Sequence, residues 1–378
     1  TISSGSTINI TGVATTALSQ VWSSHERLFF IEKNTMNAWY LSTKAIGGAA
    51  TKLPLGQIFK RGGSLLFGAN WSLDAGDGQD DVCMFITTEG EIAVYSGINP
   101  ASASTWELVG VYLISKPLNK HAYFDAGGDV AIMTEDGIVP VSAAITKDRA
   151  ALQSHAITMP IEDAWQEAVF NRSAGYPFTA TLWRSATMLI VGVPSLDGAN
   201  DVAFVSNART GAWCRFTGWD IRCSAVFDDK FYFGTDSGTV VQGETSGKDV
   251  AGGYIGRWVP KFNDDGNANC KLAVHARLTS RTKQSYVPAI QAFSDFNLGA
   301  YDSVVPSEAT SGDVWGTAIW GTAIWGDDGI KKTTTTWQTV SAIGVALAPV
   351  YQIASNNTQA PTVELIVGDL IYETGSPL

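Results

Sequence analysis

Clustered carboxylates are the first feature of this sequence that could do chemistry. The stretch LDAGDGQDD, residues 73–81, sets four aspartates among glycines: Asp74, Asp77, Asp80 and Asp81. Hard oxygen ligands on a flexible loop can hold calcium. The stretch does not follow the D-x-[DN]-x-[DN]-G pattern of a known calcium loop, and no glutamate stands at the offset which that loop requires. An exposed turn is therefore the favoured interpretation, with calcium binding left as an alternative.

The sulfur and imidazole side chains show no spacing typical of a reactive or metal-binding site. The four histidines lack ligand spacing, and the four cysteines form no C-x-x-C pair. The cysteines lie in or beside apolar runs, where a free thiol behaves as a small hydrophobe. We expect buried thiols, with a disulfide as the alternative, for Cys83, Cys214, Cys223 and Cys270.

Familiar catalytic signatures are also missing from the sequence. It has no G-x-S-x-G, no H-E-x-x-H and no G-x-G-x-x-G after a strand. The run GETSGK, residues 243–248, is similar to a phosphate-binding loop. It is one residue short between its glycines, however, and Asp249 replaces the Ser or Thr that would bind magnesium. The sequence therefore predicts a protein that is not an enzyme, with no catalytic residue, no cofactor and no metal.

Composition favours a β-rich protein with extensive buried surface. Charged residues make up 16% of the chain and hydrophobic residues 45%, with 38 glycines and 13 tryptophans. Globular domains usually contain about a quarter charged residues. The net charge of −11, without a long basic run, argues against sequence-driven binding of nucleic acid. An acidic surface repels DNA, which would suit a channel that passes DNA without binding it. No apolar run is long enough to span a bilayer.

Short strand–turn–strand units must position any site in the first part of the chain. Apolar, β-branched and aromatic runs are separated by tight turns at Gly90, Gly137, Gly211 and Gly238. The spacing between these glycines is irregular, which excludes a strict repeat. We predict an all-β fold, with a β-propeller-like domain over residues 1–243. A short helical insertion is expected at about residues 143–172, where Pro160 and acidic residues precede an apolar stripe.

The residue composition and the length of the apolar runs change after residue 243. The Gly-rich stretch 243–256 is typical of a linker or loop. Longer apolar runs follow, and we predict a β-sandwich-like platform domain over residues 257–378. Within it, VWGTAIWGTAIWG, residues 314–326, repeats Trp every five residues, a period that fits neither one helix face nor one strand face. Because Trp is enriched at interface hot spots, the candidate subunit-interface residues are Trp315, Trp320 and Trp325, with packing inside the chain as the alternative.

One segment resembles a known family. The run WCRFTGWDIRCSAVFDDKFYFGTDSGTVVQ, residues 213–242, looks like a recurring segment of tail proteins from short-tailed, double-stranded DNA phages. The Trp-Gly repeat at 315–326 is similar to W-[DG]-x-x-x-W runs in the same proteins. The resemblance covers roughly residues 57–378. The chain departs from the family pattern because it is rather short and lacks obvious early propeller blades.

The resemblance implies a structural protein of the virion tail, of the nozzle or tail tubular type. Such proteins form rings in which a propeller is joined to a β-rich platform. The implied partners are further copies of the chain, expected in a hexamer, a head-to-tail adaptor and other tail proteins. DNA would pass through the lumen without specific binding. The implied location is the virion tail, after assembly in the host cytoplasm.

Two other functions remain as alternatives to a ring subunit. The first is a receptor- or glycan-binding propeller adhesin of a phage tail. The second, less favoured, is a polysaccharide hydrolase, which would need a cleft with converging carboxylates.

Overall fold

The computed structural model describes residues 9–73, 80–172, 176–194, 202–249, 252–283, 286–304, 331–356 and 361–377. The chain divides into two compact units, Thr1–Gly243 and Glu244–Leu378. Both consist mainly of strands, so the predicted all-β, propeller-like fold class is confirmed. In the described part of the chain, no helix has both the length and the apolar character needed to cross a membrane.

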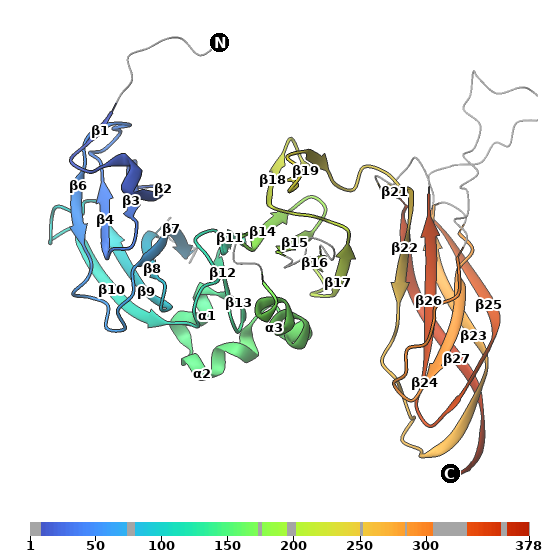
Figure 1. Ribbon diagram of the computed structural model, residues 1–378. Helices are drawn as coiled ribbons and strands as arrows, with labels where there is room; N and C mark the ends of the chain where they lie inside the picture. The colour runs from blue at the N-terminus through green and yellow to red at the C-terminus, as the bar shows by residue number, and fades with distance from the viewer. Residues whose placement is uncertain are drawn as a thin grey trace, which may run out of the picture. The chain divides into compact units, whose positions relative to one another are not determined.

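Five small antiparallel sheets follow one another along the first unit (Figure 1). Within each sheet the strands pair in the order of the chain, which is the order of a propeller blade. A short parallel pair, β1 (Ile10–Thr11) with β5 (Gly48–Ala49), stands beside them. The strands, sheet by sheet, are β2 (Leu18–Ser24), β3 (Arg27–Glu32), β4 (Asn37–Tyr40) and β6 (Thr51–Pro54); β7 (Leu65–Leu73), β8 (Asp80–Thr87), β9 (Glu91–Gly97) and β10 (Trp106–Leu113); β11 (Tyr123–Asp125), β12 (Val130–Thr134) and β13 (Gly137–Pro140); β14 (Thr179–Trp183), β15 (Met188–Val193), β16 (Val202–Asn207) and β17 (Trp213–Thr217); and β18 (Cys223–Phe227), β19 (Lys230–Gly234) and β20 (Val240–Gln242).

Successive sheets meet through their first strands. β2 contacts β7, β11 contacts β14, and β14 contacts β18. Between β7 and β11, the rings of Phe67 and Tyr123 stack with their centroids 4.6 Å apart. The sheets therefore have their first strands as an inner row, as propeller blades do, and apolar clusters fill the space between neighbouring sheets. Among the described residues, no contact of similar extent joins β18 to β2.

The helices lie together between β13 and β14. They are α1 (Val141–Thr146), α2 (Arg149–Leu152) and α3 (Glu162–Phe170), with short 3-10 turns between them. Trp165 on α3 is fully buried, and its Nε1 donates a hydrogen bond to the Thr134 carbonyl on β12 at 3.1 Å. This contact fixes the helical segment against the third sheet.

The second unit is a sandwich of two sheets. One sheet has the order β21 (Lys248–Asp249), β22 (Gly252–Trp258), β26 (Leu347–Ser355) and β24 (Ala289–Ser294). The other has the order β25 (Lys332–Gly344), β23 (Asn269–Thr282) and β27 (Val363–Pro377). Their inner faces share one core, which includes Leu278 from β23, Val340 from β25 and Tyr351 from β26.

Candidate functional site

Several residues singled out in the sequence lie outside the described residues. These include the interface candidates Trp315, Trp320 and Trp325, as well as Asp74 and Asp77. Asp80 and Asp81 begin β8, but their side chains are not described. Among the described residues, no group of three or more His, Cys, Asp or Glu side chains could hold a metal ion.

The cysteines differ in exposure. Cys83 is fully buried, and burial raises the pKa of its thiol to about 12, so it remains protonated at neutral pH. Cys270 is partly buried. The expectation of burial is wrong for Cys214 and Cys223, which are exposed. Cys214 lies on β17, the last strand of its sheet, and Cys223 begins β18, the first strand of the last sheet. In the part of the chain that the structure describes, each of these strands has one sheet neighbour.

Neutral polar groups join the inner row of strands in the first unit. The Gln20 amide on β2 accepts a hydrogen bond from the Gly68 N–H on β7 at 2.6 Å and donates to the Gly68 carbonyl at 2.9 Å. The same amide nitrogen lies 3.0 Å from the Tyr123 hydroxyl on β11. Further along, the hydroxyls of Thr181 on β14 and Ser224 on β18 lie 2.7 Å apart. Amides and hydroxyls thus connect the strands at the place where a propeller commonly carries its site.

Carboxylates do not converge on this inner row in the described residues. Of the five first strands, β2, β7, β11, β14 and β18, only β11 contains one, Asp125 at its end. Asp125 forms an ion pair with Arg184 at 3.3 Å, and both side chains are mostly exposed. The described part of the row therefore lacks the pair of facing carboxyl groups that glycoside hydrolysis uses.

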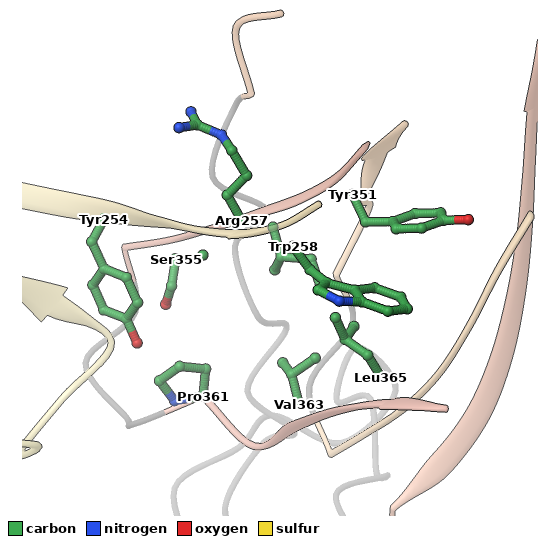
Figure 2. A pocket seen from close by; sticks show the side chains of 10 residues that line it. Tyr254, Arg257, Trp258, Tyr351, Ser355, Pro361, Val363 and Leu365 are labelled. Atoms are coloured by element: carbon green, nitrogen blue, oxygen red, sulfur yellow. The ribbon is translucent and has the colours of Figure 1, made fainter. Parts of the chain in front are cut away.

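The second unit carries a groove along one side of its sandwich. The groove has a volume of about 260 Å³ and lies between β22 and the start of β27. Figure 2 shows Tyr254, Trp258, Pro361 and Val363 around the open space, while the side chain of Arg257 points away from it. The lining is mainly apolar and aromatic.

Alternation along β22 produces the aromatic wall. Tyr254, Gly256 and Trp258 occupy every second position of the strand and all line the groove. Trp258 is 39% exposed and stacks on Tyr351, with ring centroids 5.2 Å apart. Arg257, on the opposite side of the strand, places its guanidinium 3.6 Å from the centre of the Tyr301 ring. Arg257 also donates to the Gln352 side-chain oxygen at 3.1 Å, so its charge is held by these contacts instead of facing the groove.

The tyrosine hydroxyls of this region are weak acids. Burial raises the pKa of Tyr254 to about 12, helped by the nearby negative charge of Glu244. Burial, followed by the charge of Asp369, also raises the pKa of Tyr351 to about 12. Both hydroxyls are protonated near neutral pH, so the groove can offer hydroxyl donors and aromatic faces. Among the described residues that line it, no nucleophile is paired with a base.

The comparisons with known proteins give only distant structural likeness. No family model matches the chain, and no curated protein matches it. Two structures of single-residue variants of an exo-β-1,3-galactanase from Phanerochaete chrysosporium, each with β-1,3-galactotriose, are similar with TM-scores of 0.31 and 0.32. Both are 6% identical in sequence to this chain. The alignments cover 93% and 97% of this chain and 95% and 99% of the two galactanase chains, respectively. A glycoside hydrolase family 43 arabinoxylan arabinofuranohydrolase from Bacillus subtilis, in complex with cellotetraose, has a TM-score of 0.28 at 9% identity, with 94% of each chain covered.

These structures correct one expectation from the sequence. All three are of glycan-cleaving enzymes, and they overturn the prediction that the chain is not an enzyme. With TM-scores near 0.3, the likeness assigns no activity to this chain. We therefore base the functional argument on the residues and their geometry.

Sequence reasoning missed the groove. The stretch that contains Tyr254 and Trp258 follows several glycines. The linker expected at 243–256 overlaps its beginning, whereas the structure has strand β22 from Gly252. The signal that could have revealed it is the alternation of Tyr254, Gly256 and Trp258, which is typical of a strand with one aromatic face. Its partners at Pro361 and Val363 are about a hundred residues away, and no local pattern connects them.

Proposed function

We propose that the chain is a structural subunit of a ring in the tail of a short-tailed phage, where it extends the channel for the genome. The observation that carries this proposal is the exposed edge strand β27. Leu365, Val367 and Ile371 on this strand are 39%, 40% and 47% exposed. A long edge strand that exposes apolar side chains is an aggregation hazard unless another chain or element covers it.

The first unit supports the same proposal. Its contacts between neighbouring sheets include aromatic packing and neutral hydrogen bonds, which a scaffold requires. The segment at residues 213–242, which resembles phage tail proteins, forms β17 to β20. Its aromatic side chains pack together: Trp219 stacks on Phe233 at 5.1 Å and on Phe231 at 6.1 Å. The resemblance therefore falls on packing residues of the scaffold.

The state of assembly of the purified chain tests this proposal. Light scattering after size-exclusion chromatography should give a mass of several subunits, expected to be six, and negative-stain images should show rings with a central opening. A chain that stays monomeric up to high micromolar concentration would contradict the proposal. A two-fold dimer without an opening would contradict it as well.

A second function, glycan binding by a tail adhesin, is favoured by the groove. Aromatic faces such as those of Tyr254 and Trp258, next to hydroxyl donors, suit the apolar faces and hydroxyls of a sugar ring. Under this alternative, the wild-type chain should bind host surface polysaccharide in a pull-down experiment, and Trp258→Ala should abolish that binding. The control is Val287→Lys, which changes an exposed side chain outside the groove lining. Equal binding by wild type and Trp258→Ala would remove the groove from consideration.

A further inference from the structure

The outer faces of the two sheets in the second unit are covered to different extents. On the sheet β21–β22–β26–β24, the chain that follows β24 returns over the face, where the Asp302 carbonyl accepts a hydrogen bond from the Gln352 amide at 3.3 Å. On the sheet β25–β23–β27, five large apolar side chains of the outer face are between 37% and 64% exposed. They are Leu272, Trp337, Ile343, Val367 and Ile371. Among the described residues, this second face therefore lacks the cover that the first one has.

Trp337 on β25 is the largest side chain of this exposed face. It lies opposite Arg277, whose guanidinium is 5.2 Å from the centre of the Trp337 ring. Arg277 is in turn paired with Asp369 on β27, so its charge is neutralised within the sheet. The indole is 49% exposed, and none of the described residues accepts a hydrogen bond from its N–H group. Trp337 therefore presents an apolar ring and an available donor, a combination common at the centre of protein interfaces.

The groove between β22 and β27 has properties that complement this side chain. Its walls are aromatic and aliphatic, and the charged residue of its described lining, Arg257, points away from it. Ser355 also lines the groove and is 2% exposed, and no described group donates a hydrogen bond to its Oγ. Figure 2 shows Ser355 beside Tyr254, with its oxygen on the side of the open space toward Pro361. Because an unsatisfied buried hydroxyl oxygen is costly, an occupant with an N–H donor is favoured over a purely aliphatic one.

We propose that Trp337 of one copy inserts into the groove of the next copy, where its N–H donates to Ser355 Oγ. This inference rests on the proposed function and names a contact that builds the ring. β25 and β27 are the two outer strands of their sheet, so Trp337 and the groove lie toward opposite sides of the unit. The contact joins two different surfaces and is therefore head-to-tail, the kind that closes into a ring. It uses side chains only and needs no pairing of strand edges.

The distribution of charge explains why a second copy can occupy the groove. The chain has a net charge of −11, so two copies repel each other over much of their surface. At the two surfaces of this contact, the guanidinium groups are held by partners of their own chain, Arg277 by Asp369 and Arg257 by Gln352. Among the described residues that line the groove or lie opposite Trp337, none brings an unpaired charge into the contact. The cost of burying an unpaired charge is thereby avoided.

Two variants test this contact. Trp337→Ala removes the inserted ring, and Gly256→Leu fills the groove. Gly256 lies between Tyr254 and Trp258 in the lining, and a Cβ built there would meet only the Ile353 carbonyl oxygen, at 3.8 Å, so the variant should fold. Light scattering should find each variant monomeric at concentrations at which the wild type assembles. A 1:1 mixture should give heterodimers and nothing larger, because one variant keeps Trp337 and the other keeps the groove.

Three further variants serve as controls. Gly256→Ala adds one methyl group, leaves the groove open and should assemble like the wild type. Val287→Lys adds a charge to a 65% exposed apolar site of the same unit, outside the groove lining, and should also assemble normally. Ser355→Ala keeps the groove open but removes the acceptor, so assembly should weaken about tenfold.

The outcomes separate this contact from the proposed function. If both variants assemble like the wild type, or if their mixture stays monomeric, the contact is wrong even though the wild type forms rings. If Gly256→Leu alone loses assembly, another side chain occupies the groove, and if Trp337→Ala alone loses it, the exposed face meets a different surface. Either result overturns the contact, as does a Trp337→Ala variant that unfolds at lower urea concentration but assembles normally. If the wild type itself never assembles, the proposed ring function fails and the contact fails with it.

Discussion

The two sides of the sandwich in the second unit are closed in different ways. On one side, the Gln338 side chain on β25 accepts a hydrogen bond from the Ile290 N–H on β24 at 2.7 Å and donates to the Pro288 carbonyl at 2.8 Å. On the other side, β22 and β27 border an apolar groove. Here the contacts between the sheets include Tyr351, whose hydroxyl lies 3.4 Å from the Asp369 carbonyl. One side is thus closed by short hydrogen bonds to the backbone, whereas the other leaves apolar surface exposed.

The difference shows where stability and interaction are expected to lie. On the closed side, one side chain forms hydrogen bonds to backbone groups of the other sheet. Removing it should lower the free energy of unfolding substantially. The open side exposes aromatic and aliphatic groups that contribute less to the fold than their size suggests. If the comparison is correct, substitutions on the closed side should change stability, and substitutions on the open side should change association.

The largest effect is expected for Gln338→Ala. This change removes the amide that is hydrogen-bonded to both the Ile290 N–H and the Pro288 carbonyl. We therefore expect a loss of about 2–3 kcal/mol in the free energy of unfolding. The midpoint of urea denaturation, followed by circular dichroism, measures it. Gln338→Glu is the matched variant: it keeps the acceptor for the Ile290 N–H but sets a carboxylate oxygen against the Pro288 carbonyl, so its loss should be at least as large. A loss as small as that of an ordinary surface residue would contradict the closed-side assignment.

A smaller effect is expected for Trp258→Ala on the open side. The indole is partly exposed and stacks on Tyr351, so we expect a cost of about 1–2 kcal/mol in the same denaturation experiment. Trp258→Phe should recover most of it by keeping an aromatic face against Tyr351. A cost larger than that of Gln338→Ala would reverse the comparison.

The tyrosines of the second unit should make the fold sensitive to alkali. The pKa values of Tyr254 and Tyr351 are raised to about 12, above the usual value of about 10, so folding favours their protonated forms. Their contribution to stability is complete below pH 10 and is lost as the pH rises toward 12. Tyrosinate absorbance should show Tyr351, which is 1% exposed, ionising later than Tyr254, which is 38% exposed. Tyr254→Phe and Tyr351→Phe assign the two steps, and the reverse order would contradict the open-side description.

The smallest effect is expected for Val367→Thr on the edge strand. The side chain is partly exposed and thus contributes little to the core, so the stability of the unassembled chain should change by less than about 0.5 kcal/mol. Assembly at limiting concentration, measured by light scattering, should weaken nevertheless. A clear loss of stability without a change in assembly would place Val367 in the fold instead of the interface.

The hairpins of the first unit were predictable because their signals are local. The Gly90 turn has a φ of 82° between β8 and β9, a conformation that glycine adopts without strain. The helix around Trp165 was visible from its apolar spacing, and it is α3. In the segment 213–242, Phe231 belongs to the last apolar cluster and Trp219 packs against it.

The groove and the ion pairs between strands of the second unit could not be predicted in the same way. Both depend on strand neighbours that are far apart in the chain, such as Tyr254 opposite Ser355 and Arg277 opposite Asp369. Strand propensity gives the segments but not their partners. The exposed cysteines show the same limit, since Cys214 lies in an apolar-aromatic segment, yet its strand is the last of its sheet.

The Gln20 amide has a consequence for how the first unit opens in solution. It makes to Gly68 the two hydrogen bonds that a neighbouring peptide group would make, although Gln20 and Gly68 belong to different sheets. Exchange of the Gly68 amide proton with deuterium therefore requires the separation of β2 from β7. That single proton would report the breathing of the joint between two blades, independently of the unfolding of either blade.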